Sequence, residues 1–222
     1  MTDYDKLNAL ISQIRDRTEI PQPLTQADMN PNPFAQFATW LEAALNSNHV
    51  QPNAMCLTTA TQDGATSARM VLLKEFDESG FVFFTNYDSQ KGQNLAQNPQ
   101  ASLLFYWENL RRQVRITGSV EKISQAESDE YFHTRPRESQ LGAWASPQSR
   151  AIESRAVLEK ELQALREKYP NDTPIPLPPF WGGYLLTPIS FEFWQHHRDR
   201  LHDRFFFRKN NQTQWQIERL AP

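Results

Sequence analysis

The sequence is poor in cysteine and has no long apolar run. Cys56 is the only cysteine in 222 residues, so no internal disulfide can form. Its place in an apolar run predicts a small core residue, and a single thiol fits a reducing compartment. No stretch approaches the ~20 apolar residues of a membrane-spanning helix, and the acidic start Met1–Asp5 is unlike a signal peptide. We therefore expect a cytoplasmic protein without a membrane anchor.

The sequence is also poor in glycine and carries little net charge. A net charge of −3 argues against a general attraction to nucleic acid. With seven glycines, neither G-x-G-x-x-G nor G-x-x-x-x-G-K-[ST] occurs, which disfavours Rossmann and P-loop sites. No Cys/His cluster has zinc spacing, and His196 and His197, as neighbours in a strand, would point to opposite faces. We expect no metal, and any anion site must be built from local arginines and lysines.

Two helices are predicted within the first 45 residues. Residues 2–17 have the apolar spacing of one helical face. Several prolines then interrupt regular structure, and a second amphipathic helix is predicted over residues 34–45. We interpret residues 1–33 as an arm with a Pro-rich connector and residues 34–222 as a single domain.

Short strands dominate the rest of the chain. Asp63-Gly64 predicts a tight hairpin turn, and Ser124 with Glu127 fits a helix-starting capping box. Closely linked strands indicate a mainly β fold with flanking helices (α+β), in which the sheet forms an antiparallel barrel. The expected strands are 53–61, 66–75, 80–86, 101–107, 111–122, 183–187, 190–195, 203–209 and 213–219, and the expected helices are 89–97, 125–134 and 148–168.

Two segments near residue 80 could hold a phosphate. Arg69 and Lys74 bracket an apolar strand, although strand parity puts them on opposite faces unless a bulge intervenes, and they could equally be surface charges. The segment Phe84–Lys91 ends a strand and begins a helix, whose free N–H groups attract anions. Capping by Asp88 or Ser89 explains this segment equally well.

A third segment could hold a phosphate monoester. Tyr131 and Arg135 are four residues apart and therefore neighbours on a helix. Pro136 should end that helix, and Ser139 follows in the turn. A phenol, a guanidinium and a hydroxyl suit a phosphate, while helix-end charge with a capping serine is the alternative.

Two more segments could place polar groups on one face of a strand. These groups are Arg111, Gln113 and Arg115 in the first segment, and Arg200, His202 and Arg204, after Trp194, in the second. The amide of Gln113 can donate and accept, which suits a flavin or pyridine edge. Three basic groups on one face repel, so an anion or electron-rich ligand would explain the second segment. A solvent-facing strand is the alternative for both.

Together, and in this order, the segments resemble the pyridoxine/pyridoxamine 5'-phosphate oxidase family from about residue 34 to the C-terminus. The motifs that carry the resemblance are R-M-V-L-L-K, Y-F-H-T-R-P-R-E-S-Q-L-G-A-W, P-P-F-W-G-G-Y and R-L-H-D-R-F. The resemblance implies an FMN-binding split β-barrel of antiparallel Greek-key type and a homodimer with FMN at its interface. It also implies oxidation of pyridoxine 5'-phosphate or pyridoxamine 5'-phosphate to pyridoxal 5'-phosphate by hydride transfer to FMN, which O2 reoxidises with release of H2O2.

The same resemblance implies a role for individual residues. Those implied to bind FMN are Arg69, Met70, Val71, Leu72, Leu73, Lys74, Phe84, Thr85, Gln90, Lys91, Gln113, Gln148, Ser149, Trp194 and Arg204. Those implied to bind the substrate are Lys74, Tyr131, Arg135, Ser139, Arg200, Leu201 and His202, with Arg200 and His202 in catalytic roles.

The chain departs from the family pattern in places. Gln90 stands where a basic residue is usual, which predicts looser FMN binding. The arm lacks a clear Arg-x-x-Tyr pair, and His196-His197 replaces smaller residues. Three rival functions are a non-catalytic flavin or vitamer carrier, a flavin or deazaflavin reductase, and an interaction module. A second phosphate clamp argues against the first two, and a colourless protein would indicate the third.

Overall fold

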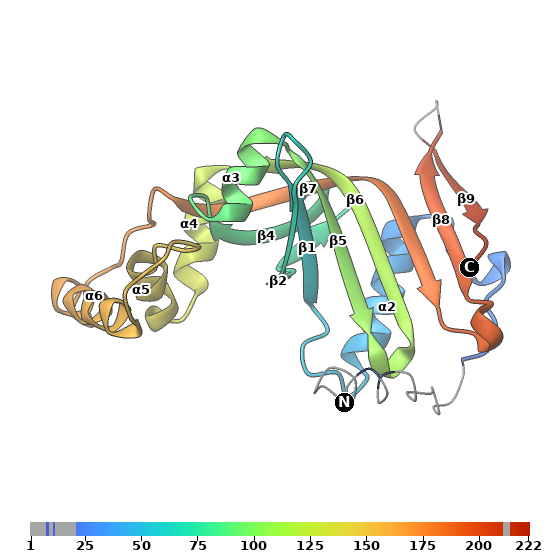
Figure 1. Cartoon of the computed structure of the whole chain (residues 1–222), viewed down its shortest axis with the longest axis horizontal. Helices are drawn as coiled ribbons and strands as arrows, with labels where there is room; N and C mark the ends of the chain where they lie inside the picture. Colours follow the sequence, from blue (N-terminus) through green and yellow to red (C-terminus); the bar gives the residue numbers. More distant parts are fainter. Residues whose placement is uncertain (1–7, 9–10, 12–20, 211–213) are drawn as a thin grey trace.

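The computed structural model describes Asn8, Ile11 and residues 21–210 and 214–222. The helix expected over residues 2–17 therefore lies outside the described residues, except at two positions. Among the described helices, none is long and apolar enough to cross a membrane. Figure 1 shows a strongly curved sheet that wraps around α2, with a pair of helices extending from one end.

One antiparallel sheet contains all the described strands. They are β1 (Ala54–Ala60), β2 (Thr66–Leu72), β3 (Glu75–Asp77), β4 (Gly80–Asn86), β5 (Gln100–Trp107), β6 (Arg112–Lys122), β7 (Trp181–Gln195), β8 (Asp203–Lys209) and β9 (Trp215–Arg219). Their order is β2-β1-β5-β6-β7-β4-β3, with β8 and β9 continuing from β7. The predicted strand at 66–75 is divided into β2 and β3, and the predicted hairpin around Asp63-Gly64 joins β1 to β2.

β7 connects the two ends of the sheet. One of its edges pairs with β6 along most of its length. Its other edge pairs first with β4, through Trp181–Leu186, and then with β8, through Ser190–Gln195. β4 and β8 therefore lie end to end along one edge of β7 (Figure 1).

A β-bulge divides β7 near its middle. Thr117 of β6 pairs with Ser190, but Gly118 pairs with Pro188, so Ile189 is an extra residue on β7. The predicted strands at 183–187 and 190–195 are therefore one strand. Proline lacks the N–H that a ladder needs, and the irregular register accommodates it.

The bulge also changes which residues of β7 face the core. Before the bulge the inward residues are even-numbered, such as Tyr184 and Leu186. After it they are odd-numbered, such as Phe191 and Phe193, both fully buried. Glu192 and Trp194 consequently lie on the opposite, outer face of the sheet.

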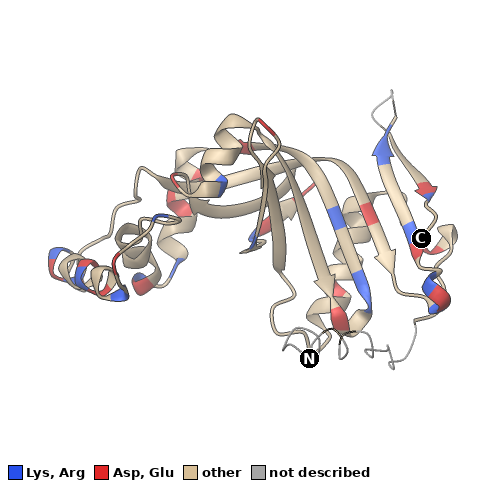
Figure 2. Cartoon of the chain, viewed as in Figure 1, with Lys and Arg blue, Asp and Glu red and all other residues tan. Residues whose placement is uncertain are grey.

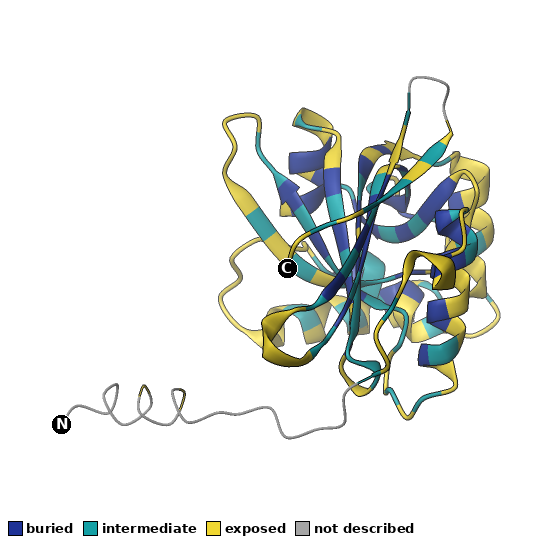
Figure 3. Cartoon of the chain, turned by 90° about the vertical axis from the view of Figure 1, so that its right-hand side faces the viewer, coloured by how far each residue is buried: buried dark blue, intermediate teal, exposed yellow. Residues whose placement is uncertain are grey.

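The main core lies between α2 and the inner face of the sheet. Burial alternates along the strands (Figure 3): Phe105 is fully buried, whereas Tyr106 is 50% exposed on the outer face. From α2, the ring of Phe37 lies 5.0 Å from those of Phe81 and Phe105. Such edge-to-face contacts orient the helix as well as burying apolar surface.

Five α-helices are described. They are α2 (Pro33–Leu45), α3 (Gln90–Gln97), α4 (Gln125–Thr134), α5 (Arg137–Ala145) and α6 (Arg155–Lys168), with 3-10 turns at Gln26–Asp28, Glu108–Leu110 and Arg198–Arg200. The predicted capping box at Ser124 and Glu127 is confirmed, with its helix ending at Thr134.

The region around Pro136 differs from the sequence prediction. Pro136 ends α4, as expected, but it also begins α5, since proline is compatible with a helix start. The predicted helix over 148–168 begins only at Arg155, and residues 148–154 form turns. Both differences arise because local signals mark the end of one helix better than the start of the next.

Cys56 was predicted to lie in the core and does not. It is half-buried on the outer face of β1, between the inward-facing Met55 and Leu57, which are fully buried. Strand alternation, not apolar context, decides its place.

Candidate functional site

A buried lysine organises a polar cluster where β4 ends and α3 begins. Lys91 is 8% exposed, and its Nζ donates to the side-chain oxygens of Thr85, Ser89 and Gln148 at 3.1, 3.3 and 2.7 Å. Ser89 also caps α3, since its hydroxyl accepts from the N–H of Gly92. Both interpretations of this segment, a cap and a cationic site, therefore hold together.

Arg69 lies beside this cluster. Its Nη1 donates to the carbonyl of Leu57 at 3.2 Å and to Thr59 at 2.8 Å, and its Nη2 donates to Ser67 at 2.5 Å. Burial, together with the neighbouring charge of Arg69, lowers the pKa of Lys91 to about 8. Among the described residues no carboxylate pairs with either cation, so the two positive charges are balanced only by neutral oxygens. Such a pair is suited to an anion. We call Arg69, Thr85, Lys91 and Gln148 the phosphate cluster.

A second group of polar side chains lies close to the phosphate cluster, along β4. The ring of Phe84, next to Thr85, stacks on Tyr131 of α4 with centroids 3.8 Å apart. The Nζ of Lys74 lies 5.9 Å from the Tyr131 ring, and an open cavity of about 410 Å³ is lined by these three residues. The same cavity is also lined by Glu75, Glu127 and Glu130, and its aromatic wall beside a lysine can hold a flat ligand.

Arg135, the C-cap residue of α4, completes this group. Its guanidinium lies 4.6 Å from the ring centroid of Trp181, and burial lowers its pKa. Its Nη1 is buried and has no hydrogen-bond partner among the described residues. Ser139, in the first turn of α5, is exposed and close in sequence to this donor. An unpaired buried guanidinium donor indicates a missing ligand, because leaving it unsatisfied is costly. We call Lys74, Tyr131, Arg135 and Ser139 the clamp.

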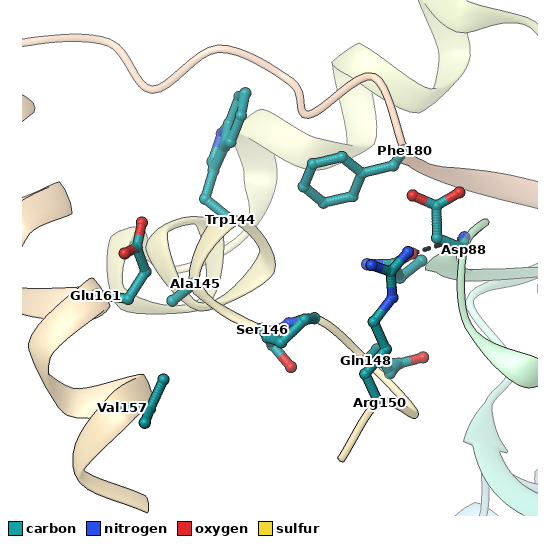
Figure 4. Close-up of a pocket in the computed structure, with 11 residues that line it drawn as sticks. Asp88, Trp144, Ala145, Ser146, Gln148, Arg150, Val157, Glu161 and Phe180 are labelled. Carbon is teal, nitrogen blue, oxygen red and sulfur yellow. Dashed lines mark hydrogen bonds between the residues drawn. The ribbon is translucent and has the colours of Figure 1, made fainter. Parts of the chain in front are cut away.

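A cavity of about 380 Å³ adjoins the phosphate cluster between the β4–α3 loop and the helices α5 and α6 (Figure 4). Trp144 and Phe180 form its apolar wall, and Gln148 and Arg150 line its polar side. Gln148 therefore belongs both to this cavity and to the hydrogen bonds of Lys91.

The remaining predicted polar residues form a row across the outer face of the sheet. Tyr106 of β5 pairs with Gln113, Gln113 pairs with Trp194 of β7, and Trp194 pairs with Arg204 of β8. The ring of His202 lies 4.7 Å from that of Trp194. We call Gln113, Trp194, Arg200, His202 and Arg204 the ring group.

The segment before β8 is not extended, so Arg200, His202 and Arg204 do not share one face of a strand, which was one of the two possibilities that the sequence left open. Residues 198–200 form a 3-10 turn, and Asp199 and Arg200 have left-handed φ values of 57° and 65°. Arg200 and His202 therefore lie on a turn, and only Arg204 lies on β8. Arg111 likewise precedes β6, with a φ of 56°, and does not share the strand face of Gln113. Neither turn contains a glycine that would indicate a left-handed residue in the sequence.

The ring of His202 has a defined neutral tautomer. Its Nδ1 accepts the backbone N–H of His197 at 3.2 Å, so the proton of the neutral ring is on Nε2. Burial and the nearby positive groups, led by His196, lower the pKa of His202. The ring is therefore held in a form that can donate one hydrogen bond to a ligand.

The phosphate cluster and the ring group lie at opposite ends of β7. Thr85 pairs with Gly182, whereas Gln113 pairs with Trp194, which is twelve residues further along the strand. At about 3.3 Å per residue this is roughly 40 Å of strand. The phosphate cluster and the clamp both lie at the β4 end of β7, whereas the ring group lies at the other end of this strand within one copy of the chain.

The other residues that were expected to bind FMN or the substrate are less well placed to contact a ligand. Leu73 is 5% exposed within the core, whereas Met70 is 65% exposed on the outer face. Of the rest, Gln90, Ser149 and Leu201 are exposed, and Val71 and Leu72 are half-buried. Because β2 alternates, its side chains cannot all face one ligand, and any contact from Leu73 would have to come from its backbone.

The sequence analysis missed residues that support Arg69. Asn94 of α3 donates from Nδ2 to both Thr59 and Ser67, at 3.1 Å each, and these hydroxyls in turn accept from Arg69. A signal was present: Asn94 lies three residues after Lys91 and therefore on the same helical face. The polar Thr59 and Ser67 also occupy inward positions of otherwise apolar strands.

Comparisons with known proteins agree with this arrangement. The sequence model described as pyridoxamine 5'-phosphate oxidase matches residues 41–169, and the model of the pyridoxine 5'-phosphate oxidase C-terminal dimerisation region matches residues 181–222. The chain belongs to the pyridoxamine 5'-phosphate oxidase family. Membership supports an FMN-type oxidoreductase that forms a homodimer, and Trp194, Arg200, His202 and Arg204 of the ring group lie in the matched dimerisation region.

Relatives within the family are similar over nearly all of their length. The pyridoxine/pyridoxamine 5'-phosphate oxidase of Gloeothece citriformis is 58% identical over 199 residues, which is 90% of this chain and 92% of the relative. The protein of the same name from Acaryochloris marina is 51% identical over 222 residues and the whole of both chains. That from Burkholderia lata is 54% identical over 201 residues, covering 90% of this chain and 93% of the relative.

Solved structures confirm the predicted fold class within the family. PhzG from Burkholderia lata, in complex with tetrahydrophenazine-1-carboxylic acid, has a TM-score of 0.84 at 29% identity and covers 91% of this chain and 99% of its own. An FMN-binding protein from Nostoc punctiforme related to the same family has a TM-score of 0.66 at 21% identity and covers 84% and 97%. The curled antiparallel sheet with flanking helices is thus the split barrel that the sequence predicted.

Proposed function

We propose that this chain is a cytoplasmic enzyme that oxidises pyridoxine 5'-phosphate or pyridoxamine 5'-phosphate to pyridoxal 5'-phosphate, with FMN as hydride acceptor and O2 as final acceptor. The observation that carries the proposal is that the phosphate cluster and the clamp, at one end of β7, each contain two cationic side chains for which the described residues show no carboxylate partner. A phosphorylated cofactor and a phosphorylated substrate would each need one of them.

FMN fits the phosphate cluster. Arg69 and Lys91 lack carboxylate partners among the described residues, so a phosphate would supply the missing negative charge. Lys91 can turn its hydrogen bonds from Thr85 and Gln148 toward the phosphate oxygens, to which the Thr85 hydroxyl and the Gln148 amide N–H can also donate. A phosphate in this cluster would place the rest of the flavin against β4 and the aromatic wall of Phe84 and Tyr131.

The substrate phosphate fits the clamp. Arg135 offers an unpaired buried N–H, and Lys74 and Tyr131 line the open cavity beside β4. With its phosphate held there, the pyridine ring would lie beside the flavin. Holding two reactants in contact is the main contribution that a protein makes to a reaction whose redox chemistry belongs to a cofactor.

A second copy of the chain would complete the site. The ring group lies roughly 40 Å along β7 from the phosphate cluster of its own copy. In a homodimer, the ring group of one copy can face the phosphate cluster and clamp of the other. We propose that residues 34–222 form one unit of such a dimer, with FMN at the interface.

The residues of the ring group have distinct tasks in this proposal. Gln113, Trp194 and Arg204 would meet the flavin, and Arg200 and His202 would cover the substrate ring. FMN, when bound, would accept a hydride from C4' of the substrate and pass the electrons to O2, yielding H2O2. Arg200 would stabilise negative charge on the substrate, and the Nε2–H of His202 would donate a hydrogen bond to it.

The likeness to PhzG raises a second candidate, the oxidation of a cyclic carboxylic acid. PhzG of Burkholderia lata is 29% identical to this chain, whereas the pyridoxine/pyridoxamine 5'-phosphate oxidase of the same organism is 54% identical. The clamp also favours a phosphate. Both observations support the phosphorylated vitamer over the carboxylic acid.

The deciding experiment mixes the FMN-loaded protein with pyridoxine 5'-phosphate in the absence of oxygen and records the flavin spectrum. Bleaching of the flavin with matching formation of pyridoxal 5'-phosphate is expected. Bleaching by tetrahydrophenazine-1-carboxylic acid but by neither phosphorylated vitamer would instead support the second candidate. Failure to bind FMN would overturn the proposal, and a bound flavin that no substrate bleaches would indicate a carrier.

A further inference from the structure

A buried carboxylate lies directly beside the ring group. Glu192 is in β7, two residues before Trp194, and its side chain is 4% exposed although it is on the outer face of the sheet. Glu192 pairs with Arg115 across the β6–β7 ladder, and Figure 2 shows acidic and basic positions on these two neighbouring strands. Burying a carboxylate is costly unless charged partners compensate it.

Two arginines provide that compensation. The Oε1 of Glu192 accepts from the Nε of Arg204 at 2.8 Å, and its Oε2 accepts from Arg115 of β6. The partners differ in exposure: the side chain of Arg115 is 52% exposed and that of Arg204 is 25% exposed. The more buried pair is thus the one that involves the ring group.

The guanidinium of Arg204 is held at two of its three nitrogens. Nε donates to Glu192, and Nη1 donates to the carbonyl of Ala221 at 2.8 Å. The backbone carbonyl of Arg204 also accepts the N–H of Leu220 at 3.0 Å, which keeps the C-terminal residues in place. Among the described residues Nη2 has no partner, so it is the part of Arg204 that remains for a ligand.

We infer that Glu192 is a positioning residue that orients Arg204 toward FMN. The inference rests on the proposed function, because Arg204 is assigned to the flavin only there. Glu192 does not touch the cofactor in this arrangement. It fixes the plane of the guanidinium, so that Nη2 is already aligned when the flavin binds and less side-chain freedom is lost.

Orientation and charge predict opposite results when Glu192 is neutralised. Removing its negative charge would make the surroundings of Arg204 more positive, which by charge alone should attract anionic FMN more strongly. Loss of alignment should weaken binding instead. The direction of the change in FMN affinity therefore separates a positioning role from a general electrostatic role.

The test measures the FMN dissociation constant of the full-length apoprotein by flavin fluorescence, together with the melting temperature of the apoprotein. Glu192→Gln should raise the dissociation constant by about tenfold, the scale of one lost charge-assisted contact. The matched control Arg115→Gln removes the other partner of the carboxylate. It should change the FMN dissociation constant by less than about threefold. In an Arg204→Gln background, Glu192→Gln should have little further effect, since there is no guanidinium left to orient.

Each other outcome has a definite meaning. An unchanged or lower dissociation constant for Glu192→Gln, with the wild type binding FMN, overturns the positioning role and leaves the proposed function intact. If Glu192→Gln weakens FMN binding equally in the Arg204→Gln background and also lowers the melting temperature, Glu192 has a structural role. This outcome also overturns the positioning role. If the wild type does not bind FMN, the proposed function fails and this inference fails with it.

Discussion

The two ends of β7 carry polar groups of very different construction. At the end near α3, the phosphate cluster and the clamp lie on or directly beside regular elements, and Lys91 and Arg69 are held by neutral oxygens. At the other end, Arg200 and His202 lie on a turn with left-handed residues, and Arg204 is held by a carboxylate. The first end is a rigid site with unbalanced positive charge. The second pairs Arg204 with a carboxylate and depends on the shape of one turn.

This difference predicts different failures. Substitutions at the first end should weaken the binding of phosphates, whereas substitutions at the second should change turnover. A dimeric site would take one end of β7 from each copy of the chain. An intact first end on one copy should therefore function with an intact second end on the other copy. Substitutions at each end test this division, beginning with the largest expected effect.

The first prediction is that two inactive variants restore each other. Arg135→Met disables the clamp and Arg200→Ala disables the turn, so each homodimer should be nearly inactive. In a randomly mixed population half the dimers contain both variants, and each has one intact site, giving about a quarter of the wild-type activity. The measurement is the oxidase rate after co-refolding of the two variants.

A control pair for this experiment comes from the same end of β7. Arg135→Met mixed with Lys74→Met should show no recovery, because every site then contains a damaged clamp. Absence of recovery with Arg200→Ala as well would mean that each site is built within one copy.

The second prediction concerns Arg200 alone. Arg200→Ala should lower kcat by about 100-fold, roughly 2.7 kcal/mol of transition-state stabilisation, while FMN content stays within about twofold of the wild type. Arg198→Ala, an exposed arginine in the same turn, is the matched control and should leave kcat unchanged. Equal losses in both variants would assign the effect to the turn and not to Arg200.

The third prediction uses the lowered pKa of Lys91. With a pKa of about 8 in the apoprotein, Lys91 loses its charge between pH 7 and pH 9, so the FMN dissociation constant should rise over that range. Lys91→Met should bind about 30-fold more weakly at pH 7 and lose this pH dependence. Lys122→Met, which removes a lysine that lies over the ring of Tyr87, should keep it.

The stability of the apoprotein should show the opposite trend. The folded pKa of Lys91 is below its unfolded value, so between pH 8 and about 10.4 the unfolded chain binds more protons. The contribution of Lys91 to the free energy of unfolding should therefore rise with pH over this range. The difference in the free energy of unfolding between the wild type and Lys91→Met, measured with denaturant, isolates this contribution. If that difference falls as the pH rises, the assigned pKa is contradicted.

The smallest effect is expected at Gln90. Gln90 is exposed at the first position of α3, so Gln90→Arg should tighten FMN binding by only about threefold, as exposed charges usually contribute little. Gln97→Arg adds the same charge at the far end of α3 and should have no effect. No difference between the two variants would remove Gln90 as an explanation for weak FMN binding.

The sequence predicted the first end of β7 better than the second. Lys91 follows a strand end and begins a helix, and Tyr131 and Arg135 share a helical face; such signals are local and they survive folding. What the sequence could not show was that Arg69 joins Lys91, because strand parity says nothing about which helix covers that face. Asn94 was missed for the same reason.

The second end required information that is not local. The left-handed φ values of Asp199 and Arg200 have no glycine or asparagine to mark them, so the sequence left open whether Arg200, His202 and Arg204 share one face of a strand. Glu192 was not recognised because its partners come from β6 and β8, which are far apart in sequence. The start of α5 directly after Pro136 was missed because a proline can end one helix and begin the next, and its local sequence indicates only the first role.

Ile189 belongs to neither end of β7, yet both depend on it. A strand alternates strictly, so without the extra residue Glu192 and Trp194 would turn inward and Phe191 and Phe193 would turn outward. Even-numbered residues of β7 thus face inward before the bulge and odd-numbered residues face inward after it. We expect substitutions at Ile189 to be tolerated. A deletion there should exchange the inward-facing and outward-facing side chains of β7 after the bulge. For this position, the number of residues in the strand matters more than their chemistry.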